Sequence, residues 1–180
     1  MLGFYRNAME QLESIEDCLN KGHVLPSLCL LYSLIDVTAS LERQPNEGKA
    51  AFVRWVDENM LKKRPLPCTA LELYAARCGV LHSFTPDSDL SRKGQARTIV
   101  YAWGRSKAEE LAEVGKRLGR TEVVLQIGDL IESFRAGLDA YLDEVVHDSE
   151  RLRKIEQLET LWFTHLDQKT VARFLRLTNT

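Results

Sequence analysis

The sequence predicts a mainly α protein, a compact helical bundle in which residues 1–180 form a single domain. Two observations predict this class. Apolar residues recur at spacings of three and four through most of the chain, which is the period of helices packed on a core. The chain has 180 residues, 44% of them hydrophobic and 28% charged, so it can bury a core without disulfides or a structural metal. One small insertion, a two-stranded β-hairpin, is also expected.

Three helices are expected in the first third of the chain. The first is amphipathic and stops near Gly22. The second runs from Pro26, a residue suited to a first helical turn, to about Leu41, and it is apolar nearly all round, which is typical of a central helix. A narrow polar line that includes Asp36 and Ser40 lies on one face of it. The third helix ends before Pro65.

A capping box begins the fourth helix. The Thr69 hydroxyl can accept from a free amide of the first turn, while the Glu72 side chain reaches back to the cap. This helix carries Arg77, and its end carries His82. The loop 85–89 follows it.

The second half of the chain contains the only expected strands. Residues 98–103 and 122–127 are rich in β-branched residues, so residues 97–127 are expected to form a β-hairpin with an intervening helix. A second capping box, Ser106 to Glu109, would begin that helix. Asp129 would cap the last helical region, residues 129–163, which is either one long helix or two helices broken near residue 148.

The charges point to a protein that is not globally built for nucleic acid, since the net charge is −2. The segment 91–107 is nevertheless basic and free of acids, and Arg92, Lys93 and Arg97 are its candidates for binding an RNA backbone. This segment and the cluster Lys62–Arg64 are either solvated faces or the two sides of an anion site.

Cellular location is also expected from composition. The four cysteines form no CxxC pair and lie mostly among apolar residues, which is typical of reduced thiols in the cytoplasm. The first 11 residues lack the basic and apolar parts of a secretory signal. The longest apolar run, Cys29 to Ile35, is too short to span a bilayer, so no membrane partner is expected.

One sequence stretch has the character of a reaction centre, Arg77-Cys78-Gly79-Val80-Leu81-His82. With the polar positions Asp36 and Ser40 on an earlier helix, it resembles the HEPN family, whose signature is an arginine, four to six residues and a histidine late in a helical bundle. The resemblance covers roughly residues 25–84, the HEPN-like core helices. Many members have a polar residue directly after the arginine, where this chain has Cys78.

The resemblance implies both a fold and an activity. HEPN domains are helical bundles that usually dimerise, and the active members are metal-independent ribonucleases, often in toxin or defence systems. Arg77 and His82 would be the catalytic pair, facing a second copy across a homodimer, with Asp36 and Ser40 as supporting residues. The alternative is a non-catalytic helical module that binds a protein, RNA or nucleotide.

The chemistry of Arg77 and His82 also suits RNA cleavage when the family resemblance is set aside. Histidine can move protons near neutral pH, and arginine stays charged and offers phosphate oxygens a fixed fork of donors. Positions five apart are about 140° apart around a helix, so Arg77 and His82 share a face only if the helix ends or distorts.

Competing interpretations stay open. Arg77 could pair with Glu72, with Asp36 or with a carboxylate of the acidic last helix, and His82 could donate to the final carbonyls of its helix. Cys78 and His82, four apart, are half of a zinc site or a nucleophilic dyad. The further ligands are missing at sensible spacing, so neither a metal nor another cofactor is expected.

Overall fold

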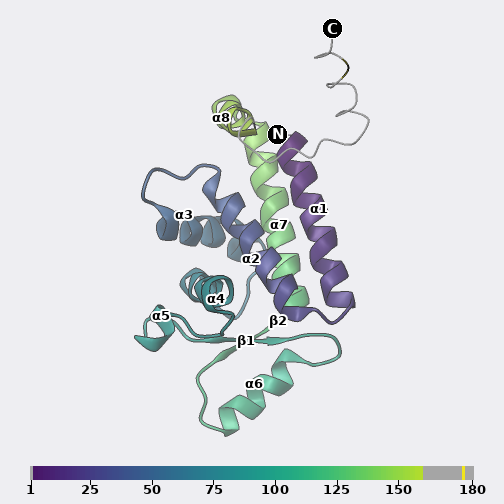
Figure 1. The fold of residues 1–180 in the computed structure, drawn as a ribbon. Coiled ribbons are helices and arrows are strands. Elements are labelled where there is room, and N and C mark those ends of the chain that lie inside the picture. The colour runs from purple at the N-terminus through teal and green to yellow at the C-terminus, as the bar shows by residue number, and fades with distance from the viewer. Residues whose placement is uncertain (1, 160–175, 177–180) are drawn as a thin grey trace.

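The structure is a computed structural model that describes residues 2–159 and residue 176. Three long helices form one side of the bundle: α1 (Leu2–Asn20), α2 (Val24–Ser40) and α7 (Ile127–Val146) (Figure 1). α2 packs against both α1 and α7. It is the central helix that its sequence predicts, with residues buried along most of its length.

The other side of the bundle contains a rare helical form. α3 (Gly48–Trp55) continues into a π-helix, η1 (Val56–Leu61), which packs on α7. A β-carbon at Gly137 would lie 3.0 Å from the Met60 backbone, so this glycine allows α7 to approach η1 closely. The third predicted helix is therefore present, but its π-helical half is not evident from the residue pattern.

α4 (Ala70–Ser83) packs on α2 and α3 and begins with the predicted capping box. The Thr69 hydroxyl accepts from the amide of Glu72, whose carboxylate accepts from the amide of Thr69 at 2.8 Å. A short helix, α5 (Asp89–Arg92), begins at the last residue of the predicted loop 85–89, and the residue pattern does not indicate it.

The two predicted strands exist, and they lie at one end of the bundle (Figure 1). β1 (Ile99–Ala102) and β2 (Val123–Gln126) are parallel, with Ile99 opposite Val123. The expected hairpin is wrong, and the structure has a crossover unit instead. α6 (Ala108–Arg117) carries the chain back to the end of the sheet where β1 begins, so β2 runs in the same direction as β1. The core side of the sheet carries Ile99, Val123 and Leu125, all buried.

Two predicted helix starts are wrong in detail. The N-cap of α6 is Lys107, which makes no side-chain capping bond, so the box Ser106 to Glu109 does not form. α7 begins at Ile127, which places Asp129 inside its first turn instead of at the cap.

The last helical region forms two helices, α7 and α8 (Ser149–Glu159), and the part of it beyond residue 159 lies outside the described residues. Arg151 on α8 binds Glu42 through two hydrogen bonds, which fixes this second helix to the end of α2. The mainly α class is thereby confirmed, with one core under all the long helices.

Candidate functional site

The site is built on the last turns of α4 and the adjacent face of α2. α4 ends where Phe84 adopts a left-handed backbone with φ 53°. His82 is therefore in the final turn, where the helix gives way to the loop, and its side chain is exposed. Arg77 lies more than one turn earlier and is partly buried against α2.

The Arg77 guanidinium contacts two other side chains. Its Nη1 lies 2.9 Å from Nε2 of His82, and its Nη2 donates to Oδ2 of Asp36 at 2.8 Å. The long arginine stem thus spans the angular separation that a regular helix imposes on positions five apart. The structure brings together Asp36, Arg77 and His82, which are three of the residues that the sequence predicts as a site.

The hydrogen bond between Arg77 and His82 determines which imidazole nitrogen is the acceptor. Arginine has only donors, so Nε2 of His82 must accept and carries no proton in this arrangement. An imidazole that accepts at Nε2 carries its proton on Nδ1. A neutral imidazole of this kind is able to take up a proton from a substrate hydroxyl.

Asp36 supports the charge on Arg77. Burial alone would lower the pKa of the guanidinium, but the hydrogen bond and negative charge of Asp36, with a smaller effect of Cys78, raise it instead. The Arg77 side chain is 17% exposed and that of Asp36 33% exposed, so the pair is shielded but still reached by water. Arg77 is held as a permanent cation with one face toward His82.

Gly79 fixes the segment that follows the site. A β-carbon there would lie 2.5 Å from the carbonyl oxygen of Thr85 and 2.8 Å from that of Asp87. The loop after His82 therefore folds back onto α4, over a position that only glycine fits. No signal in the sequence indicates this close approach.

The structure places Ser40 outside this group of contacts. Its hydroxyl donates to the Val37 carbonyl of its own helix at 2.7 Å.

Cys78 lies beside Tyr74, whose pKa is raised mainly by burial and then by the charge and hydrogen bond of Cys78. Among the described residues, no three histidine, cysteine or acidic side chains are grouped as metal ligands.

The predicted RNA-binding residues have different surroundings. Arg92 pairs with Asp89 one turn away, and both are exposed. Lys93 is exposed at the end of α5. Arg97 instead binds the buried Glu72 carboxylate, with Nε to Oε1 at 2.5 Å and Nη2 to Oε2 at 3.0 Å.

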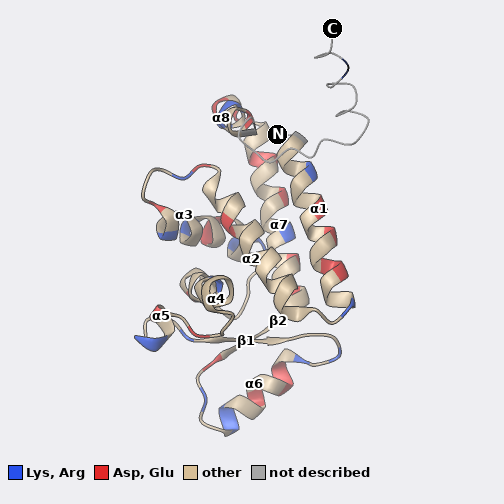
Figure 2. Cartoon of the chain, in the orientation of Figure 1, with Lys and Arg blue, Asp and Glu red and all other residues tan. Residues whose placement is uncertain are grey.

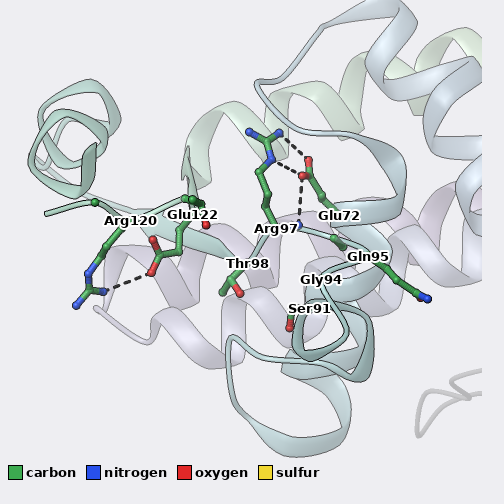
Figure 3. A pocket seen from close by; sticks show the side chains of 11 residues that line it. Glu72, Ser91, Gly94, Gln95, Arg97, Thr98, Arg120 and Glu122 are labelled. Carbon is green, nitrogen blue, oxygen red and sulfur yellow. Dashed lines mark hydrogen bonds and ion pairs between the residues drawn. The ribbon is translucent and has the colours of Figure 1, made fainter. Parts of the chain in front are cut away.

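Figure 3 shows this pair at a pocket of about 480 Å³, which lies between the loop after α5 and the loop before β2. The Arg97 guanidinium is thus already paired with a carboxylate of the fold. The sequence indicates Glu72 as part of the capping box and as a possible partner of Arg77, and it gives no sign of a partner 25 residues further along the chain.

Comparisons with known proteins add no relatives. A scan against models of protein families, a search of curated proteins and a search of solved structures each found no match. Among the described helices, none combines the length and the apolar character that crossing a bilayer requires.

Proposed function

We propose that this chain is a HEPN-like endoribonuclease that cleaves single-stranded RNA without a metal ion, with Arg77 and His82 as its catalytic pair. One observation carries the proposal: the Arg77 guanidinium lies within hydrogen-bond distance of both His82, at 2.9 Å, and Asp36, at 2.8 Å. A permanent cation and a proton carrier are two of the elements that phosphodiester transfer needs, and here they are adjacent.

The reaction is an internal transesterification. His82 Nε2 takes the proton of the ribose 2′-hydroxyl, the 2′-oxygen bonds to phosphorus, and the bond from phosphorus to the 5′-oxygen breaks. Arg77 donates to the non-bridging oxygens, whose negative charge grows in the transition state. The products are a 2′,3′-cyclic phosphate and a 5′-hydroxyl. The incoming phosphate would take over the Arg77 donor that now bonds to His82.

Asp36 is a positioning residue in this proposal. It holds Nη2 of Arg77 at 2.8 Å and leaves Nη1 on the side of His82. A rigidly held arginine loses less side-chain entropy when it binds a phosphate. Ser40 is proposed only to line the same face of α2.

The leaving 5′-oxygen needs an acid, and one Arg–His pair offers a single proton carrier. We therefore propose a homodimer with α4 near the interface, so that a second copy supplies a second pair, whose His82 in its protonated form gives the proton to the leaving 5′-oxygen. An exposed apolar side chain next to the site supports this arrangement: Phe84, two residues after His82, is 69% exposed.

We place the activity in the cytoplasm, in the toxin or defence setting that the family resemblance implies. All four cysteines, Cys18, Cys29, Cys68 and Cys78, are free thiols, which suits a reducing compartment.

The test incubates purified protein with labelled single-stranded RNA in excess chelator. We expect His82→Ala and Arg77→Ala each to lose roughly a hundredfold or more of the activity, from the proton-transfer and electrostatic contributions. The double variant should be little worse than either, because the pair acts as a unit. DNA of the same sequence should survive, because it lacks the 2′-hydroxyl.

Two controls make the result decisive. His23→Ala changes an exposed histidine at the start of α2 and should leave cleavage unchanged. Circular dichroism must show that the Arg77 variant is folded, because it leaves Asp36 without its partner. Full activity of a folded His82→Ala variant, or complete dependence on magnesium, would overturn the ribonuclease proposal.

A second function is favoured by one observation. The Arg77–Asp36 ion pair is a structural contact that a non-catalytic helical module would also need. In that case the protein would bind a partner through its surface, and neither Arg77 nor His82 would affect RNA. The same chelator assay separates the two functions.

A further inference from the structure

The unit formed by β1, α6 and β2 exposes an unusual amount of apolar surface. Among the described residues, ten large hydrophobic side chains are exposed, and five of them belong to this unit. These five are Val100 on β1, Trp103 just after it, and Leu111, Val114 and Leu118 on and just after α6. α6 itself has no buried residue. Contiguous apolar surface of this kind marks an interaction site.

The three α6 residues form one stripe. Leu111, Val114 and Leu118 follow at intervals of three and four, so they lie on one side of the helix. We call them the α6 stripe. They border a cavity of about 380 Å³ whose other wall includes Val100 and Val124 from the outer face of the sheet. The helix therefore covers the sheet only in part, and an apolar groove remains beside the stripe.

The charges on α6 are polarised along its axis. Its first turn carries Glu109 and Glu110, and its last turn carries Lys116 and Arg117 (Figure 2). Glu110 and Arg117 are two turns apart, so they lie along the same edge of the stripe. An acidic start and a basic end make this edge complementary to itself when a second helix runs in the opposite direction.

The positions of these groups share one centre. The midpoint between Glu110 and Arg117 falls beside Val114, and so does the midpoint between Leu111 and Leu118. A twofold axis at Val114 would place Leu111 of one copy against Leu118 of the other. It would also form two equivalent contacts, each between Glu110 of one copy and Arg117 of the other. Such a contact is isologous, the usual kind in homodimers.

The ion pairs that Glu110 and Arg117 already form within the chain do not prevent these contacts between two copies. Glu110 pairs with Lys107 at 3.3 Å, and Arg117 pairs with Glu113 at 3.1 Å. All four side chains are largely exposed, and such surface pairs contribute little to stability. Changing partners across an interface therefore costs little.

We propose that a second copy of this chain docks on the α6 stripe, with the two α6 helices antiparallel about a twofold axis at Val114. This contact is separate from one that involves α4, which lies toward the opposite side of the sheet (Figure 1). It does not depend on the ribonuclease proposal.

Disulfide trapping reads this contact directly. In Val114→Cys, the new thiol would lie next to the same thiol of the second copy at the twofold axis. Mild oxidation should therefore convert most of the full-length chain to a covalent dimer. The matched control is Glu109→Cys, an exposed position about 140° away around the helix. It should stay at the level of the wild-type chain, which carries four free cysteines of its own.

Charge exchange then tests the orientation. In the Val114→Cys background, Glu110→Arg alone or Arg117→Glu alone should slow trapping about tenfold, because each places like charges opposite each other twice. The double variant Glu110→Arg with Arg117→Glu reverses the helix edge and should restore the rate. Trapping of Val114→Cys no faster than Glu109→Cys overturns the docking site. Failure of the double variant to recover overturns the antiparallel arrangement.

Discussion

At the scale of single residues, the candidate site is a contact between Arg77 and His82 on α4 and Asp36 on α2. Arg77 and His82 are conspicuous because a cation and a titratable ring stand together near a helix end. Their separation around a regular helix argues against contact, and the contact exists because arginine is long and helix α4 ends just after His82. Asp36 is noticed only as one polar residue in an apolar helix, and its bond to Arg77 depends on how α2 packs on α4.

Gly79 gives a residue-scale prediction. Gly79→Ala should destabilise the fold by about 1–3 kcal/mol, because the added methyl group meets two backbone oxygens that cannot move independently of the loop. Urea denaturation measures this change. Gly128→Ala is the matched control: its β-carbon would meet nothing within 4 Å, so it should be neutral or stabilising by up to about 1 kcal/mol. Equal stability of the two variants would show that the loop does not press on Gly79.

At the scale of elements, helices with a clear apolar period and a self-contained cap are predictable. The capping box at Thr69 is local, so the residue pattern is enough to find it. The π-helix η1 depends instead on the approach of α7 at Gly137, a long-range contact without a local signature. The pairing of β1 with β2 was predicted, but its direction follows from the crossover through α6.

Glu72 gives an element-scale prediction because it joins α4 to the segment before β1. Burial alone would raise its pKa, but the hydrogen bonds from Arg97 and Thr69 lower it below the usual 4.5. The charged form therefore stabilises the fold above the usual pKa, and this contribution is lost as the pH falls through the lowered value. Glu72→Gln should cost roughly 1.5–3 kcal/mol at pH 7, the range for charged hydrogen bonds. The deficit should shrink below about pH 4.5.

Denaturation of both proteins between pH 3 and pH 7 measures this deficit. Glu13→Gln, at an exposed position on α1, is the matched control and should show a small, constant difference from the wild type. A deficit for Glu72→Gln that is constant across the same range would contradict a stabilising role of the charge.

At the scale of the whole molecule, class and core follow from periodicity, whereas surfaces do not. The sequence predicts a mainly α bundle, and one connected core unites its long helices. The exposed apolar groove beside α6 arises from the way that helix packs on the two-stranded sheet. No local pattern separates an apolar stripe that packs inward from one that faces outward, so the α6 stripe became visible only in three dimensions.

The distribution of charge gives the last prediction. The net charge is −2, so RNA affinity must come from a local surface, and the acid-free segment 91–107 is its best candidate. Arg97 is a poor choice for testing it, because reversing its charge would place two carboxylates together at Glu72. The informative variant is Arg92→Glu with Lys93→Glu, since both residues are exposed on or beside α5.

Under the ribonuclease proposal, RNA binding should be weak and should fall steeply with salt, because counterions are released from the strand. Fluorescence anisotropy with a single-stranded RNA in chelator, repeated across potassium chloride concentrations, gives the slope of log affinity against log salt. Loss of two phosphate contacts should reduce that slope by roughly 1.4. Arg43→Glu with Lys49→Glu makes the same charge change around the turn between α2 and α3, and it should leave the slope unaltered. Equal slopes for the two double variants would mean that the basic segment does not contact the strand, and the RNA path would have to be sought elsewhere on the molecule.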